Sequence, residues 1–533
     1  MKFRSTALAA ILICCISCVE VDNRVGSGFL PREQSYITDT INIYLDEIYL
    51  SMADSLSGFS QRHMVVGSIM DEEGNVSGRD AILTLAPLQS EMDFGTNPKL
   101  KKFHLALGLD SASVYRKSDE NILQTLNVYE LSEPINARKN FDCNAKIKHG
   151  SKQICLSRPV LDGDDSLCIN FTEEYAKKFF SLSSDDLETW DSYTAKIPGI
   201  YLRTDPADNC GGRFNEYEIQ MSYSTTLTAL AGNYAKLSFT SDYDGVQKDT
   251  TFYFYVGAQK KMDPDSLLAN TTSGTNYPQF SLNLTDEEAF RPESGKKVTN
   301  AIPIYGGGGP KPRIRGGYLR DIVKDAISRK GYDPSKVLIN KARMNFFFEF
   351  PGNLDEMYLF PDVLSPTTRI KTDTTMSYIG ITDNSSESEN MGDIDRVYKC
   401  YSPDFSYHMQ QILSCSDDDL SSGDYDLWML LMSYVTTTTD TSNSSMSDYY
   451  QQLAYQSYYG SMYGGGGIGG YDSYSNYYNY MMLAQYYGTS TSTSTALQMD
   501  NSNYYKCSLY GPQSSVKGTR PRLTITYSVP KYK

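Results

Sequence analysis

The sequence predicts a mainly β protein with two β-sandwich lobes of a jelly-roll-like kind and a few short helices. Short segments rich in β-branched and aromatic residues recur along the chain, and turn-forming residues bound them. Clear helical periodicity is confined to two segments. The chain has 533 residues, 40% of them hydrophobic, so it is long enough for two or more domains with large buried cores.

The first lobe is expected over residues 36–262. It opens on TDTINIYLDEIYL (38–50), where Ile41, Ile43 and Leu45 alternate with polar residues and so share one face of an extended strand. The segment TEEYAKKFFSL (172–182) predicts one helix. Further strands are predicted at KFHLALGLDSASVYRK (102–117), QTLNVYELS (124–132), GIYLRT (199–204), YAKLSFTSDY (234–243) and TTFYFYVG (250–257).

The second lobe is expected over residues 263–533. Its helix, predicted over 316–331, spaces apolar residues at i, i+3 and i+4, and Gly331 marks its end. Strands are predicted at VLINKARMNFFFEFPG (337–352), EMYLFPDVLSP (356–366) and PRLTITYSV (521–529). Each lobe has a strand with a central alanine, then an apolar strand and a proline-ended turn. Two interpretations are open for this pattern, an internal repeat or a chance similarity between strands.

Two segments have an unusual composition. Residues 436–495 are rich in Tyr, Ser, Gly and Thr, and they predict a disordered insertion, with a Tyr-rich adhesive surface as the alternative. The stretch YGGGGPKPRIRGG (305–317) lacks the Gly-Lys-Ser/Thr ending of a phosphate-binding loop. Its prolines also remove backbone N–H donors, so a flexible connection is predicted there.

The N-terminus has the pattern of a lipoprotein signal. Lys2 and Arg4 precede an apolar stretch of about ten residues and then Ser17-Cys18. This predicts a signal peptide at 1–17 and places Cys18 as the acylated first residue of the mature chain. Residues 18–35 are polar and contain Gly and Pro, as expected of a tether. An anchor of two or more acyl chains, such as palmitate, gives stable membrane attachment.

Several segments resemble one family of Bacteroidota lipoproteins, the domain-of-unknown-function type DUF4270. The landmarks are VGSGFLP (25–31), LDSASVYRK (109–117), INKA (339–342) and the closing RPRLTITYSV (520–529). The resemblance implies an outer-membrane lipoprotein, and it provides no catalytic residue to carry over. Glu20 and Asp22 resemble the surface-export signal of that phylum and favour the cell surface over the periplasmic face.

The composition disfavours several function classes. A formal net charge of −15 disfavours nucleic acid, which needs clustered Lys and Arg. No H-E-x-x-H or G-x-S-x-G motif is present, and the four histidines have no ligand spacing, so no catalytic residue, metal site or cofactor is predicted. The acidic segments 162–166 and 416–426 are interpreted as solvated loops, with calcium binding as the alternative. Trp190 and Trp428 are candidates for stacking on a glycan, with core packing as the alternative.

The cysteines after Cys18 are sparse and lack a C-x-x-C motif. In an exported protein, three disulfides are possible: Cys143–Cys155, Cys168–Cys210 and Cys400–Cys415. Cys507 would then remain a free thiol.

The leading functional hypothesis is therefore an outer-membrane-anchored lipoprotein that acts as a non-enzymatic binding or structural module of the cell envelope. The expected partners are membrane lipid, through the acylated cysteine, and another envelope protein or a glycan. The alternatives are a glycan-binding surface lipoprotein of a polysaccharide-handling system and, third, a hydrolase.

Overall fold

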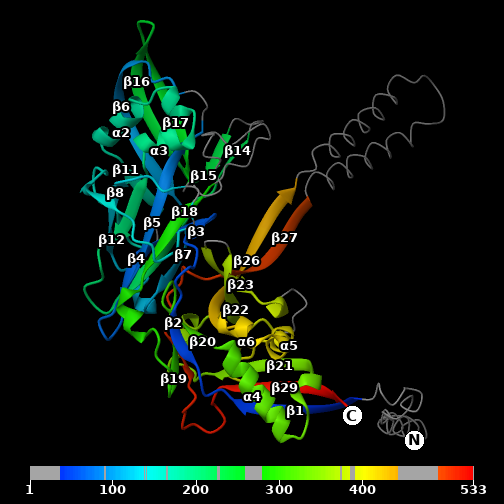
Figure 1. The fold of residues 1–533 in the computed structure, drawn as a ribbon. Helices are drawn as coiled ribbons and strands as arrows, with labels where there is room; N and C mark the ends of the chain where they lie inside the picture. The colour runs from blue at the N-terminus through cyan, green and yellow to red at the C-terminus, as the bar shows by residue number, and fades with distance from the viewer. Residues whose placement is uncertain are drawn as a thin grey trace, which may run out of the picture.

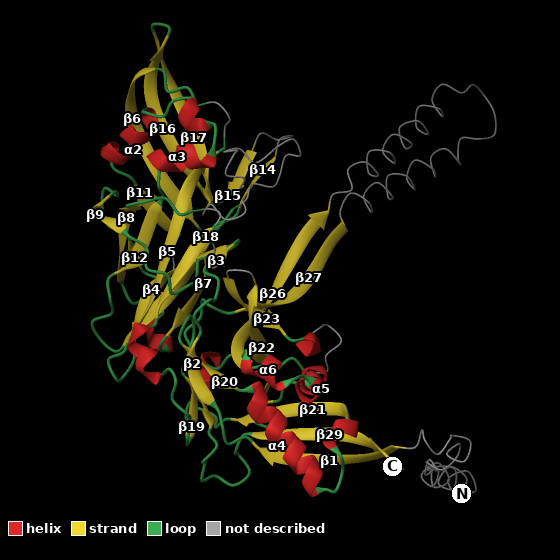
Figure 2. Ribbon diagram, viewed as in Figure 1, coloured by secondary structure: helices red, strands yellow, loops and turns green. Residues whose placement is uncertain are grey.

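The computed structural model describes residues 36–531, except 89–91, 137–138, 140, 164–165, 225–228, 258–278, 373–374, 385–389 and 442–489. The predicted mainly β class is confirmed, because 48% of the residues are in strands and 17% are helical. The strands are paired antiparallel in every ladder of the described residues. Figure 2 shows that the helices are few and short.

Two lobes are visible in Figure 1, and each has its own hydrophobic core. The first lobe has a 14-stranded sheet that bends around one core. Its central strand is β5 (Val76–Pro87), which pairs with four others. These partners are β4 (His63–Met70), β12 (Ile200–Thr204), β17 (Val246–Gly257) and β18 (Ser281–Asp286).

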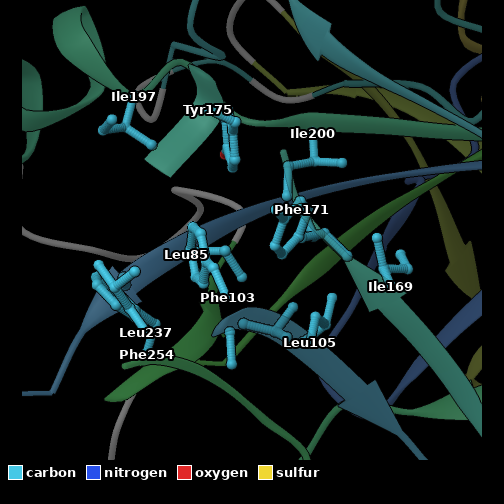
Figure 3. Packing of buried hydrophobic residues seen from close by; sticks show 14 of the residues in the cluster. Leu85, Phe103, Leu105, Ile169, Phe171, Tyr175, Ile197, Ile200, Leu237 and Phe254 are labelled. Carbon is cyan, nitrogen blue, oxygen red and sulfur yellow. The ribbon is translucent and has the colours of Figure 1, made fainter. Parts of the chain in front are cut away.

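Aromatic rings fill the core of the first lobe (Figure 3). Phe103, on β6 (Thr96–Leu107), lies between rings from β17 and from α2 (Glu173–Phe180). The helix predicted at 172–182 is thus confirmed. Its N-terminus is capped by Thr172, whose side chain accepts a hydrogen bond from the Tyr175 backbone N–H, and its apolar face is buried on the sheet. A second short helix, α3 (Trp190–Lys196), lies beside it.

The second lobe combines a five-stranded and a six-stranded sheet around one core. In the first of these, β29 (Arg522–Pro530) lies between β1 (Tyr36–Tyr44) and β21 (Leu338–Phe347). The second sheet has the order β2 (Tyr49–Met52), β20 (Pro310–Ile314), β26 (Leu427–Thr441), β22 (Val363–Thr372) and β23 (Thr375–Gly380). The predicted helix is confirmed as α4 (Gly316–Arg329), which buries Leu319, Val323 and Ile327.

The boundary between the lobes differs from the predicted division at residue 262. β1 and β2 belong to the second lobe, where they pair with β29 and β20. β18 lies beyond the predicted boundary but pairs with β5 in the first lobe. The chain therefore starts in the second lobe, forms the first lobe and then returns to the second. Local periodicity does not predict this path, because tertiary packing determines which strands pair.

Part of the predicted insertion at 436–495 forms strand. β26 continues to Thr441 and pairs with β27 (Ser490–Met499), with Thr436 opposite Thr495 and Thr441 opposite Ser490. Thr favours extended backbone, which explains why these ends of the insertion form a ladder. Residues 442–489, with the rest of the predicted disorder, lie outside the described residues.

Two further segments differ from expectation. The strand predicted at 356–366, the second of the repeat pattern, is a strand only from Val363, where β22 begins. Its first residues belong to a 3-10 helix, Leu354–Leu359, so the two halves of that pattern do not fold alike. The acidic segment 416–426 contains the short helix α6 (Asp417–Ser421), because the Ser416 and Asp419 side chains form a capping box.

The Gly-rich stretch at 305–317 is a buried turn and strand rather than a flexible connection. Gly306, Gly307, Gly308 and Gly309 are buried and lead into β20. Lys311, on β20, has a side chain that is only 2% exposed. Its Nζ donates to the carbonyl oxygens of Tyr305 at 2.5 Å, Gly306 at 3.2 Å and Gly307 at 2.9 Å. A Cβ at Gly307 would meet the Arg79 guanidinium and one at Gly308 the Asn144 side chain, so the glycines allow this turn to pack closely against the first lobe.

Burial lowers the pKa of Lys311 from 10.5 to about 7. Between these two values the unfolded chain holds this proton more tightly than the folded chain, so stability rises with pH across that range. We expect the free energy of unfolding of the wild type to increase by about 2 kcal/mol from pH 7 to pH 9 relative to that of Lys311→Met. Denaturant titrations of both proteins at the two pH values measure this difference, and parallel pH profiles would contradict it.

Candidate binding cavity between the lobes

A cavity of about 830 Å³ lies where the two lobes meet. Residues 57–63 form one wall, around β3 (Phe59–Ser60) and the start of β4. A second wall is the end of β13 (Gly211–Glu218) with Gln220, and the third is the segment 498–503 from the second lobe. Segments that are far apart in the sequence therefore meet at one hollow, whose lining is rich in amide, hydroxyl and charged side chains.

The wall from the second lobe is held by one buried carboxylate, Asp500. It accepts hydrogen bonds from the Ser433 hydroxyl at 2.5 Å, the Asn503 side-chain amide at 2.8 Å and the Tyr505 hydroxyl. Backbone N–H groups of Ser502 and Asn503 also donate to it, each at 3.1 Å. Burial and the nearby Asp500 carboxylate raise the pKa of Tyr505, so this phenol remains a donor. The loop shape is thus fixed before any ligand binds.

A buried ion pair of the first lobe lies close to the cavity and contacts the second lobe. The side chains of Arg79, on β5, and Glu287 are 1% and 3% exposed, and Arg79 Nη1 lies 2.5 Å from Glu287 Oε1. Arg79 Nε also donates to the carbonyl of Asn501 in the second lobe at 3.1 Å. The guanidinium lies 4.3 Å from the centroid of the Phe214 ring, and Ser77 Oγ donates to the second oxygen of Glu287 at 2.7 Å. Nearly every polar atom of the pair therefore has a partner.

One histidine lies between two carboxylates at the edge of the cavity. His63 begins β4, Glu216 is on the neighbouring β13, and Asp110 is on β7 (Leu109–Val114), which pairs with the other edge of β13. His63 Nδ1 lies 2.9 Å from Glu216 Oε1, and His63 Nε2 lies 3.3 Å from Asp110 Oδ2. Ser111 Oγ donates to Glu216 Oε2 at 2.8 Å. The cluster offers a ring nitrogen and two carboxylates on three adjacent strands.

The structure places neither tryptophan where it could stack on a glycan. Trp190 is fully buried in the core of the first lobe. Trp428 is 3% exposed and packs edge-on against Tyr378, with the guanidinium groups of Arg313 and Arg369 over its ring. The core alternative is correct for both, because a large aromatic ring gains most by leaving water.

The three predicted disulfides are not formed. All seven cysteines of the described residues are free thiols. Cys143 and Cys155 belong to different hydrophobic clusters, and burial raises the pKa of both thiols. In the second pair, Cys168 is exposed on β11 (Leu167–Asn170), whereas the thiol of Cys210 accepts a hydrogen bond from Arg116. In the third pair, Cys400 is on β25 (Cys400–Tyr401), whereas Cys415 follows α5 (Ser406–Ser414). Cys18 lies outside the described residues.

Sequence reasoning did not identify the cavity residues. His63 and Glu216 are distant in sequence, and neither is part of a motif. The available signal was the alternation of polar residues with aromatic ones in RFNEYE (213–218), which does not single out Glu216. Their proximity follows from the pairing of β4 with β13, which only the fold reveals.

Comparisons with known proteins identify no relative: no family model, no curated protein and no solved structure matches this chain. The resemblance to the lipoprotein family stays a prediction. In the part of the chain that the structure describes, no helix has the length and apolar character needed to cross a bilayer.

Proposed function

We propose that this protein is a lipid-anchored, non-catalytic binding module of the bacterial outer membrane, and that the cavity between its lobes holds the partner. The observation that supports this most strongly is the convergence of three separate chain segments on one polar hollow that rigid strands support. Ligand sites are commonly found in such concave places between structural units.

The position of the described N-terminus agrees with an anchor at Cys18. The first described residue, Tyr36, begins an edge strand of the second lobe. A flexible tether over residues 18–35 would have a root-mean-square length of about 23 Å. The second lobe would then lie nearer the membrane, with the cavity and the first lobe beyond it.

Lipid labelling tests the anchor. Cells that produce the wild-type chain in the presence of labelled palmitate should incorporate label into the protein, whereas the Cys18→Ala variant should incorporate none and should leave the membrane fraction. The reason is that Cys18 provides the only thiol at the predicted cleavage site that remains in the mature chain. Label retained in Cys18→Ala would refute the anchor.

Co-purification tests the cavity. Gln498 is exposed at the cavity wall, so the Gln498→Trp substitution should fill space without disturbing a core. We expect this variant, purified from solubilised outer membrane, to lose at least ten times the amount of its partner relative to the wild type. Gln247→Trp is the matched control, because Gln247 is equally exposed on β17, far from the cavity. Equal recovery with both variants would contradict the cavity as the site.

A glycan is the second candidate for the partner. The exposed side-chain amides of Gln61, Gln220 and Gln498 are suited to hydrogen bonds with hydroxyl groups. The two buried tryptophans provide no stacking platform for it. Retention of the wild type, but not of Gln498→Trp, on an immobilised outer-membrane polysaccharide would favour the glycan over a protein partner.

A further inference from the structure

The histidine at the edge of the cavity has an unusual hydrogen-bonding situation. An ionised Glu216 can only accept hydrogen bonds, and its Oε1 lies 2.9 Å from His63 Nδ1, so this contact favours the ring tautomer that carries its hydrogen on Nδ1. In the neutral ring this leaves Nε2 with a lone pair. That nitrogen is buried, it has no hydrogen-bond partner, and it faces the Asp110 carboxylate at 3.3 Å.

Two electron-rich groups that face each other at this distance need a positive charge between them. A proton on Nε2 would provide one, as an ion pair with the Asp110 carboxylate. A divalent cation provides the alternative. Two ligands bound to a tetrahedral metal at about 2.0–2.1 Å lie about 3.3–3.4 Å apart, which matches the observed separation.

We propose that His63 Nε2 and Asp110 Oδ2 bind a divalent transition-metal ion, of which zinc is the representative, at the edge of the cavity. Glu216 orients the imidazole by accepting its Nδ1–H, the arrangement in which metal-binding histidines are usually held. Ser111 in turn holds Glu216 through its second oxygen. A mixed nitrogen and oxygen set suits zinc better than calcium, which takes oxygen ligands.

Two protein atoms leave coordination positions of the ion for other ligands. The Asp110 side chain is 41% exposed and that of His63 is 18% exposed, so water or a polar group of a bound partner can complete the coordination shell. Because His63 and Glu216 also line the cavity, the ion would present a positive charge to a ligand there. Metal binding itself requires neither the partner nor the membrane anchor, so it can be measured on the protein alone.

The test is titration of the purified full chain with zinc by calorimetry and with cobalt by visible absorption. We expect one zinc ion per chain in the wild type and no binding at this site in His63→Ala. Asp110→Asn, at a partly exposed position, is the second variant, and it should also lose binding while it folds as the wild type. Glu216→Gln should bind zinc 10- to 100-fold more weakly, since the imidazole loses its orienting acceptor.

His104→Ala is the matched control, because His104 lies in the same lobe on β6 and is not part of the cluster. It should bind zinc as the wild type does. A cobalt spectrum without a thiolate charge-transfer band would exclude a cysteine ligand, and the His63→Ala and Asp110→Asn variants assign the ion to this site. Zinc binding that is absent from the wild type, or unchanged in both His63→Ala and Asp110→Asn, would overturn the proposal. A partner that still binds the metal-free protein would leave the proposed function standing.

Discussion

Replacement of Phe103 by alanine is expected to lower the free energy of unfolding of the first lobe by about 3–5 kcal/mol. The Phe103 ring is 1% exposed, and its centroid lies 4.7 Å from that of Phe171, 5.0 Å from that of Phe179 and 6.0 Å from that of Phe254. These rings come from different elements, so the cavity left by the substitution cannot collapse by the movement of one side chain.

Denaturant titration followed by tryptophan fluorescence measures this loss, because Trp190 is buried in the same core. The matched control is Leu123→Ala. Leu123 is 70% exposed, so its truncation should change stability by about 0.5 kcal/mol or less. A loss below about 1 kcal/mol for Phe103→Ala would mean that the aromatic cluster does not hold the lobe together.

The second large effect is expected at the buried Arg79–Glu287 ion pair of the first lobe. Glu287→Leu leaves the Arg79 guanidinium buried without its carboxylate, which should cost about 3–5 kcal/mol. The double substitution Arg79→Met with Glu287→Leu should be less destabilising than Glu287→Leu alone, because no buried charge remains. The same titrations on the wild type, both single variants and the double variant give the coupling energy between the two sites.

Glu174→Leu is the control for this experiment. Glu174 pairs with Lys152 on the surface, where both side chains are at least 70% exposed, and its loss should leave stability unchanged. If Glu287→Leu behaves in the same way, the buried pair does not stabilise the folded protein.

Much of the fold could be predicted from the sequence. Of the three alternating residues predicted to share a face, Ile41 is buried on β1, Ile43 is half-buried there, and Leu45 is buried directly after the strand. The helices at 172–182 and 316–331 end close to the expected residues. These features depend on local periodicity and capping, which neighbouring residues determine. The Gly-rich stretch at 305–317 misled because glycine and proline are typical of loops, and here the glycines allow close packing against Arg79 and Asn144.

The division into lobes and the cavity could not be predicted in the same way. β1 and β29 pair although they lie at opposite ends of the chain. β18 comes after the predicted boundary at residue 262, but it pairs with β5 in the first lobe. The cavity and the His63 cluster depend on which strands become neighbours, a property of the whole fold. Trp190 and Trp428 were singled out as glycan-stacking candidates because they are the two tryptophans of the sequence, but both are packed in hydrophobic cores.

Site-specific photo-crosslinking tests the proposed binding cavity most directly. A photoreactive phenylalanine analogue is placed at Gln61, an exposed residue of the cavity, in the full chain in intact cells. The same analogue at Gln247 is the control. The proposed function predicts a discrete crosslinked envelope component from position 61 and none from position 247. Crosslinks from both positions alike, or from position 247 alone, would contradict the cavity as the place where the partner binds.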